Sequence, residues 1–307
     1  MLHRFLMYDL PSRIFNRKEY RVLPYLKSLS TGDTITLIIL LICLIIGVYG
    51  SFIEPFRLKV TRWDVRTEKW TYQRELKIAV LTDMHMIWPW MTRKHLMKAV
   101  EKANSLQPDI IVLLGDYVAT HPFGIQLNPE KSLEPLKKLS ARCGVYAVLG
   151  NHDLHPRSSW PEALKATDIP VLINQSLPVD CDGEKFWIAG LDELWWGKAD
   201  IKKTLEGVEN DSPVLLMMHN PDSFPDVPEN VALSMAGHTH GGQIRFPFIG
   251  SLSIVVPSKY GNRYAYGHVK EGNKDIVISS GIGMTGIPLR LFNPPEVGLI
   301  VLSGTEH

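Results

Sequence analysis

Polar residues that can bind a metal ion or move a proton follow an apolar run at five places in the sequence. The clearest example is Gly150-Asn151-His152-Asp153, which follows the run GVYAVL. The other four runs are followed by Asp83 and His85, by Asp116, by His219, and by His238 and His240. Imidazole, carboxylate and amide groups in such a set suit borderline divalent ions such as Mn, Fe, Zn or Co.

The number of candidate ligands indicates two ions rather than one. Asp83, His85, Asp116, Asn151, His219, His238 and His240 are seven candidates. One ion with an open position needs fewer, whereas two ions that share a carboxylate would use them all. Two ions about 3.5–4 Å apart can hold both the attacking and the leaving oxygen of a displacement, and can lower the pKa of a bound water toward ~7. The set contains no cysteine, which argues against a closed structural zinc site.

The apolar runs read as buried strands that alternate with helices. Residues 76–81, 109–114 and 144–149 are nearly continuous apolar runs, and helical spacing is present in 92–106 and 129–140. Such runs predict an α/β sheet covered on both faces. Further strands are expected at 184–191, 213–219, 231–238, 274–280 and 297–303. Ligand sites in open α/β sheets lie outside the carboxyl ends of the strands, so the polar groups should converge there.

The motifs in this order resemble the signature of the calcineurin-like metallophosphoesterases. The resemblance covers roughly residues 76–303, and its parts are Asp83-Met84-His85, Gly115-Asp116, Gly150-Asn151-His152-Asp153, His219 and Gly237-His238-Thr239-His240. It implies a four-layer α/β/β/α sandwich with two mixed sheets. It also implies that the protein is an enzyme that hydrolyses phosphoric esters or pyrophosphates with two divalent metal ions.

The same resemblance implies a role for each motif residue. Asp83, His85 and His240 would hold one ion, Asn151, His219 and His238 would hold the other, and Asp116 would bridge the two. His152 would bind no metal and would instead stabilise the phosphoryl oxygens or protonate the leaving group. Asp153 would be the second catalytic residue and would orient His152.

A second feature of the sequence is an uncharged apolar segment near the N-terminus. Residues 34–53 read TITLIILLICLIIGVYGSFI, and about 20 such residues span the hydrocarbon core of a bilayer. We predict a transmembrane helix, the alternative being a buried core helix. The predicted organisation is a lead-in over 1–33, the transmembrane helix over 34–53, a linker or first hairpin over 54–75, and the catalytic domain over 76–307.

Charge and cysteine content bear on partners and location. The formal net charge is +1, so no nucleic acid partner is expected. Basic residues are almost equally frequent on the two sides of the apolar segment. Because basic residues favour the cytoplasmic side, their slight excess after the segment predicts a cytoplasmic catalytic domain. We therefore predict a single-pass protein of the inner membrane whose domain lies on the cytoplasmic face. Three cysteines without C-x-x-C spacing give no indication of an oxidising compartment.

Two tryptophans after the first ligand pair are candidates for substrate binding. Trp88 and Trp90 lie in MIWPWM (86–91), which is either a loop packed on the domain or an apolar lip that enters the bilayer or holds acyl chains. His121 is a weaker candidate because it follows a ligand-bearing strand. We expect the side chains of the apolar segments 194–196 and 246–249 to be buried in the core.

The motifs define the reaction class but leave the substrate open. Membrane-tethered members of the resembled family include phosphodiesterases and UDP-2,3-diacylglucosamine diphosphatases of lipid A synthesis. We predict a membrane-bound, lipid-linked phosphoester such as UDP-2,3-diacylglucosamine, cleaved by metal-activated hydroxide to UMP and an acylated sugar 1-phosphate. Three alternatives stay open: a phosphoprotein phosphatase, a general phosphodiesterase, and a membrane scaffold without turnover.

Overall fold

The computed structural model describes residues 30–305 except 121, 156–157, 210–211 and 252. The chain divides into two compact units, residues 1–46 and residues 47–307. Most of the predicted lead-in over 1–33 lies outside the described residues.

One helix among the described residues is long and apolar enough to cross a membrane, by length and composition. Helix α2 runs over Thr31–Phe52, close to the predicted 34–53. Its start is capped in both directions, because Asp33 N donates to Ser30 Oγ and Ser30 N donates to Asp33 Oδ2. Its large apolar side chains are mostly exposed, with Leu44 among the most exposed.

The first sheet has the strand order β1-β15-β2-β4-β6. Its strands are β1 (Lys59–Arg66), β15 (Glu296–Ser303), β2 (Leu76–Leu81), β4 (Ile110–Leu113) and β6 (Val145–Ala147). Strands β2, β4 and β6 are parallel, so their carboxyl ends lie at one edge. Strand β1 pairs with β15, so the segment 54–75, expected as a linker or first hairpin, supplies a strand at the edge of the sheet.

The second sheet has the order β13-β14-β10-β9-β8-β7. These strands are β13 (Gly267–Glu271), β14 (Lys274–Ile278), β10 (Leu233–Ala236), β9 (Val214–Met217), β8 (Glu184–Gly190) and β7 (Gln175–Cys181). The four inner strands are parallel, and the outer pairs β13–β14 and β7–β8 are antiparallel. Both sheets are therefore mixed, as predicted.

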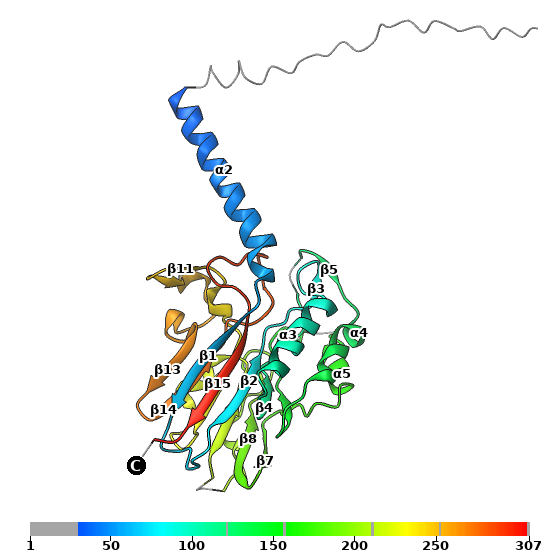
Figure 1. The fold of residues 1–307 in the computed structure, drawn as a ribbon, viewed down its shortest axis with the longest axis vertical. Helices are drawn as coiled ribbons and strands as arrows, with labels where there is room; N and C mark the ends of the chain where they lie inside the picture. Colours follow the sequence, from blue (N-terminus) through cyan, green and yellow to red (C-terminus); the bar gives the residue numbers. More distant parts are fainter. Residues whose placement is uncertain (1–29, 121, 156–157, 210–211, 252, 306–307) are drawn as a thin grey trace, which may run out of the picture. The chain divides into compact units, whose positions relative to one another are not determined.

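Strand β2 shows how the core forms on both sides of the first sheet. Successive side chains of a strand point to opposite faces. Ile78 and Val80 belong to an apolar cluster shared with β9 and β10 of the second sheet, whereas Ala79 and Leu81 pack with the helices. Those helices are α3 (Arg93–Ser105), α4 (Pro129–Leu133) and α5 (Trp160–Lys165), which lie on one side of this sheet in Figure 1. The continuous apolar run of β2 reflects burial of both faces.

The outer face of the second sheet carries a third apolar cluster. Short helices supply part of its cover, namely α6 (Ile201–Thr204) and the 3₁₀ helix η3 (Pro221–Asp226). The protein thus has an α/β fold with two mixed sheets, and the fourth, helical layer of the expected sandwich stays a prediction. The remaining short elements are β3 (Ile87–Trp88), β5 (Ile125–Gln126), β11 (Arg245–Phe246), β12 (Gly250–Ser251), η1 (Glu54–Phe56), η2 (Glu134–Lys138), η4 (His240–Gly242), η5 (Ser253–Val255) and η6 (Gly261–Tyr264).

The last turn of α2 belongs to the second unit and is fixed there by backbone hydrogen bonds. Gly50 O accepts from Arg290 N at 2.9 Å, and Ser51 O accepts from Trp90 Nε1 at 2.9 Å. A Cβ added at Gly50 would lie 2.5 Å from Leu289 Cδ1. No free linker therefore separates residues 47–52 from the rest of this unit.

A disulfide joins two cysteines that the sequence presents as isolated. Cys143 precedes β6 of the first sheet and Cys181 ends β7 of the second, with their Cα atoms 5.4 Å apart. The bond therefore links the edges of the two sheets. Sequence spacing could not predict it, because the pair is 38 residues apart and belongs to no motif.

Substitution of Gly50 tests how tightly the end of α2 is packed. Gly50→Ala should lower the melting temperature of the full-length protein in detergent by several degrees, since overpacking costs about 1–3 kcal/mol. Gly47→Ala is the matched control in the same helix, because a Cβ there meets nothing within 4 Å. Equal melting temperatures for the two variants would contradict the tight packing.

Candidate metal centre

All seven predicted ligands lie together at the carboxyl ends of five strands. They follow β2 (Asp83 and His85), β4 (Asp116), β6 (Asn151), β9 (His219) and β10 (His238 and His240). Each of the seven is buried. Because the strands within each sheet are parallel here, and the sheets pack face to face, groups far apart in sequence meet at one edge.

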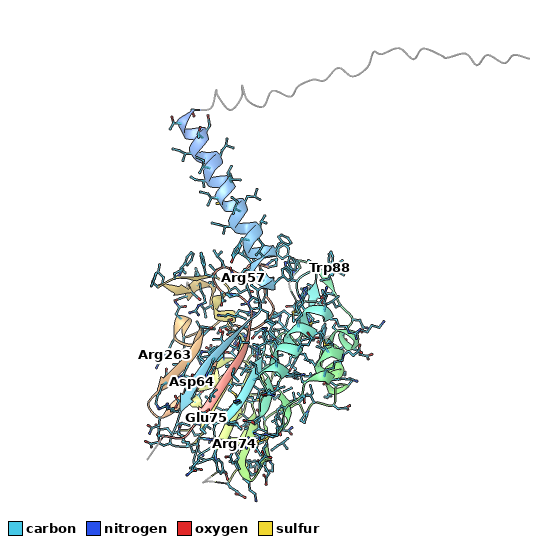
Figure 2. The ribbon with its side chains drawn as sticks, viewed as in Figure 1. Arg57, Asp64, Arg74, Glu75, Trp88 and Arg263 are labelled. Carbon is cyan, nitrogen blue, oxygen red and sulfur yellow. A yellow bond between two sulfur atoms is a disulfide. The ribbon has the colours of Figure 1, made fainter. Side chains whose placement is uncertain are left out.

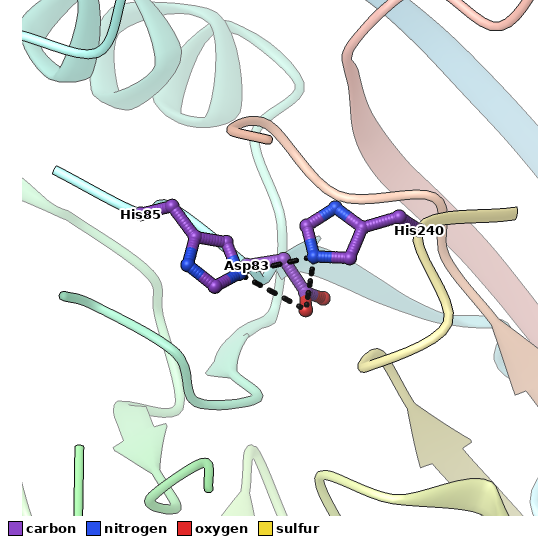
Figure 3. Close-up of side chains that lie close together, drawn as sticks. All are labelled: Asp83, His85 and His240. Atoms are coloured by element: carbon purple, nitrogen blue, oxygen red, sulfur yellow. Dashed lines mark hydrogen bonds and ion pairs between the residues drawn. The ribbon is translucent and has the colours of Figure 1, made fainter. Parts of the chain in front are cut away.

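One cluster consists of Asp83, His85 and His240 (Figure 3). The Nε2 atoms of His85 and His240 are 3.0 Å apart. Asp83 Oδ1 lies 3.3 Å from His240 Nε2 and 4.0 Å from His85 Nε2. Two ring nitrogens and a carboxylate oxygen thus face a common point, as ligands of one borderline divalent ion would.

A second cluster contains Asn151, His219 and His238. Asn151 Oδ1 lies 3.1 Å from His219 Nε2 and 2.9 Å from His238 Nδ1. Asp116 Oδ2 lies 3.2 Å from His219 Nε2 and 3.4 Å from His85 Nε2. Asp116 therefore reaches both clusters, which is the geometry that a bridging carboxylate needs.

Two of the histidines are held in a defined tautomer by backbone carbonyls. His85 Nδ1 lies 3.0 Å from Val118 O, and His219 Nδ1 lies 2.7 Å from Leu114 O. A carbonyl oxygen can only accept, so each Nδ1 carries the hydrogen and donates it. In the neutral ring the Nε2 lone pair then faces the cluster. Metal-binding histidines in proteins are usually oriented in this way.

Five of the candidate ligands adopt a backbone conformation that non-glycine residues rarely adopt. The φ angles of Asp83, His85, Asp116, His238 and His240 are 52°, 44°, 57°, 70° and 52°. This left-handed conformation is uncommon outside glycine, and each strained residue costs about 1–3 kcal/mol. It turns the chain sharply after the strand, so the side chains of these residues point into the shared site.

Glycines let the two carboxylates approach the backbone of neighbouring strand ends. A Cβ at Gly150 would lie 2.2 Å from Asp116 Oδ1, and a Cβ at Gly237 would lie 2.4 Å from Asp83 Oδ2. Real Cβ atoms essentially never approach so closely. Any side chain at these positions would therefore displace a candidate ligand.

The charges of the site show that it requires positive charge. Burial by itself would lower the pKa of His219, but Asp116 raises it to about 10. Burial would raise the pKa of Asp116, yet His219 and His85 hold it well below its usual range. Burial raises the pKa of Asp83 to about 6. A compensating cation stabilises buried carboxylates, so the donor set fits divalent metal ions.

His152 lies at the edge of the clusters and differs from the ligands in being partly exposed. Its side chain is 22% exposed, and its Nε2 lies 3.9 Å from Asp116 Oδ2. Its Nδ1 is hydrogen-bonded to the hydroxyl of Thr120. Burial lowers the pKa of His152, while the charge of Asp116 opposes that shift. A ring placed in this way can contact a group that enters from solvent.

The hydrogen bonds of Asp153 correct its predicted role. Its carboxylate accepts from the backbone N–H groups of Gly150, Asp116 and Tyr117 at 2.8 Å, and from Val118 at 3.3 Å. The His152 Nδ1 is hydrogen-bonded to Thr120 rather than to Asp153. Asp153 therefore ties the end of β6 to the end of β4. Burial raises its pKa to about 7.

A second supporting group was not recognised from the sequence. Asn293 Nδ2 donates to His240 O at 2.7 Å, and Asn293 N donates to the carboxylate of Glu54, directly after α2. The buried Arg290 guanidinium donates to the carbonyls of Ser280, Gly281, Gly283 and Asn293. These residues lie in loops without an apolar run, and no local pattern marks them.

The predicted substrate-binding residues have different environments. Trp88 is 53% exposed and labelled in Figure 2, whereas Trp90 is half-buried and donates to Ser51 O. Met86, Ile87 and Met91 are buried, so most of this segment packs on the domain and only Trp88 could act as a lip. His121 lies outside the described residues.

The prediction that the apolar segments 194–196 and 246–249 fill the core is wrong. Trp195 is 51% exposed, and its ring centroid lies 4.5 Å from that of the candidate ligand His238. Trp196, Phe248 and Ile249 are also exposed. Of these exposed side chains, Trp195 lies beside the candidate metal centre and could contact a substrate.

Another cavity lies away from this site. It has a volume of about 840 Å³ and is lined by Arg74, Lys77, Asp109 and Arg142, at the amino ends of β2 and β4. Arg74 lies at the opposite end of the unit from Trp88 in Figure 2. Both arginines are paired with Asp109 and Asp182, so they are not free to bind a phosphate.

An α/β fold with a two-cluster His/Asp site at its strand ends defines a dimetal hydrolase, and comparison with known proteins specifies the family. Residues 76–242 match the family model described as calcineurin-like phosphoesterase. A relative from Bacillus subtilis, "Uncharacterized metallophosphoesterase YkuE", is 32% identical over 84% of this chain and 90% of its own length. The chain belongs to the calcineurin-like phosphoesterase family, and it is a metal-dependent phosphoester hydrolase.

Two other relatives carry more descriptive names. "Phosphodiesterase YaeI" of Escherichia coli is 32% identical over 74% of this chain and 82% of its own length. "Transmembrane protein with metallophosphoesterase domain" of Danio rerio is 28% identical over 87% of this chain, which spans 62% of that protein.

Substitution of Gly150 tests the link between strand-end geometry and metal binding. Gly150→Ala should displace Asp116 and remove at least half of the bound metal, because Asp116 reaches both clusters. Metal content of the purified protein measures the effect, and circular dichroism confirms that the variant is folded. Gly47→Ala, which also adds a methyl at an ordinary φ, should keep its metal. Full metal content in Gly150→Ala would refute the geometry.

Proposed function

We propose that the protein is a membrane-anchored dimetal phosphoesterase that hydrolyses a phosphodiester or pyrophosphate bond of a lipid-linked substrate. The observation that carries the proposal is the convergence of seven buried candidate ligands, with Asp116 between two clusters. Asp83, His85 and His240 would hold one divalent ion, Asn151, His219 and His238 the other, and Asp116 both. When bound, the ions supply Lewis acidity that activates a water and polarises the phosphoryl oxygens.

The chain's own residues would position the substrate and handle its charge. His152 would donate a hydrogen bond to a phosphoryl oxygen or a proton to the leaving group, since its Nε2 lies beside Asp116 and its ring is partly exposed. Thr120 would orient the ring through Nδ1. Asp153 would act indirectly, by keeping the strand ends that bear Asp116 and His152 in register.

Two observations support a lipid-linked substrate and a membrane anchor. Helix α2 has the length and composition of a membrane span, and relatives are named transmembrane proteins. Trp195 is exposed and lies beside the candidate ligand His238, Trp88 is exposed three residues after His85, and tryptophan is enriched where proteins meet a membrane interface. The resemblance by itself implies UDP-2,3-diacylglucosamine as the specific substrate.

A general phosphodiesterase is the second candidate, and the name of the Escherichia coli relative favours it. Such an enzyme would hydrolyse water-soluble and lipid-linked diesters alike. A phosphoprotein phosphatase would act on phosphopeptides, and a scaffold would hydrolyse none of these compounds.

Hydrolysis by the full-length protein in detergent tests these functions. With added Mn²⁺, we expect turnover of bis(p-nitrophenyl) phosphate and faster turnover of a lipid-linked phosphoester, with UDP-2,3-diacylglucosamine, a phospholipid and a phosphopeptide compared as substrates. His152→Ala should lower kcat by about 10²- to 10⁴-fold, as loss of a general acid does, while metal content stays unchanged. His268→Ala, on strand β13 and outside the candidate ligand clusters, is the control and should retain activity. No metal-dependent hydrolysis of any substrate would support the scaffold.

We infer that the catalytic unit lies outside the cytoplasm. The disulfide between Cys143 and Cys181 supports this side, because disulfides persist in oxidising compartments and are rare in the cytosol. The flanking basic residues give only a slight lean to the cytoplasmic face, and long domains can be translocated regardless of such charges. The protein would then be a single-pass protein of the inner membrane with its catalytic unit on the far side, and its lipid-linked substrate there would be a phosphoester other than UDP-2,3-diacylglucosamine, because UDP-linked sugars are cytoplasmic.

Thiol alkylation in cells tests this location. In a Cys43→Ser background, a maleimide that shifts gel mobility should modify the denatured protein only after reduction, and then at two positions. The matched control, Cys43→Ser with Cys143→Ser and Cys181→Ser, should show no shift. Alkylation of both cysteines without a reductant would place the unit in the cytoplasm.

A further inference from the structure

An apolar cavity shares a wall with the metal centre. It has a volume of about 300 Å³, and its lining includes Thr239 and the candidate ligand His240. The rest of the wall is largely aliphatic: Ile244, Val255, Ile287 and Leu289. We propose that this cavity binds an acyl chain of the substrate whose phosphoester lies at the metal centre. The proposal rests on the proposed function and specifies the part of the substrate that is recognised.

Most polar groups in the cavity wall already have partners in the protein, the exception among the described residues being the buried Nδ1 of His240. The Thr239 hydroxyl donates to Ala265 O at 2.7 Å. The Gln243 side chain donates to Thr285 O and accepts from Thr285 N. His240 directs its Nε2 to Asp83 and His85. Because the Thr239 and Gln243 side chains are already hydrogen-bonded, a sugar or peptide would find few partners here besides His240 Nδ1, whereas a hydrocarbon chain needs none.

The size of the cavity fits one chain better than a whole amphiphile. Ligand sites generally range from about 300 to 1,000 Å³, so this cavity lies at the lower limit. A lipid would therefore place its phosphoester at the metal centre and one chain in the cavity.

The rim of the cavity carries exposed aliphatic side chains that a water-soluble substrate would not require. Val255 is 47% exposed and Ile287 is 70% exposed. On another wall, Leu289 packs against Gly50, in the last turn of the apolar helix α2. The wall of the cavity therefore contacts the last turn of α2, which belongs to this unit.

Chain-length dependence of hydrolysis tests the acyl site. Substrates are p-nitrophenyl phosphodiesters of methanol, butanol and octanol below their micelle concentrations, with Mn²⁺. Each buried methylene should raise kcat/KM about fourfold, from about 0.8 kcal/mol per methylene. Val255→Trp, which fills the cavity, and Ile287→Arg, which puts a charge at its rim, should abolish this increase while the methyl ester is hydrolysed as before. Phe248→Arg is the control, because Phe248 is exposed but does not line the cavity.

A binding measurement separates this proposal from the proposed function. Ile287→Cys in a Cys43→Ser background should react with a maleimide more slowly in octyl phosphonate than in methyl phosphonate. The acyl site would be overturned if both cavity variants kept the chain-length dependence of kcat/KM. It would also be overturned if the maleimide reacted equally fast in both phosphonates, even if the methyl ester is hydrolysed. Absence of all hydrolysis, with slower labelling in octyl phosphonate retained, would overturn the phosphoesterase function and leave the acyl site standing.

Discussion

The structure depends on one electrostatic constraint: carboxylates and imidazoles must be held close together in a place from which water is excluded. Asp83 and Asp116 are both buried, and such charges are very unfavourable without a compensating cation. The Asp116–His219 pair meets part of this demand. Divalent ions would meet it fully, and would also relieve the like-charge contact between the carboxylates. The parallel strands, the strained residues and the glycines all serve to bring these groups within a few ångströms.

The sequence predicted those parts of the site that depend on local patterns. Each ligand follows an apolar run, and such a run predicts a buried strand whatever the rest of the chain does. Parallel strands then place their carboxyl ends at one edge, so the meeting of Asp83, Asp116 and Asn151 followed from the strands alone. The buried strands and the apolar helix α2 were predictable for the same reason, since burial on both faces of a strand and a long uncharged apolar run leave a direct compositional record, whereas the arrangement in two mixed sheets came from the family resemblance.

The parts that sequence reasoning missed depend on contacts between loops. Asp153 looked like a partner of His152 because the two are adjacent, yet its carboxylate turns back to the N–H groups after β4. Thr120 takes that place from a loop 32 residues away. The disulfide joins two sheets through residues with no spacing rule. Such pairings arise from the tertiary fold, and a pattern of hydropathy contains no information about them.

Hydrogen bonds connect the end of α2 to the loops that support the candidate metal centre. Glu54, directly after the helix, accepts from Asn293, which in turn holds the carbonyl of His240. Gly50 and Ser51 are hydrogen-bonded to Arg290 and Trp90. A flexible linker would let a tethered enzyme sample many orientations. Here the chain leaves no such linker, so within this unit the site is held in one orientation to the end of the helix. An enzyme built in this way is suited to a substrate that is itself confined to a surface.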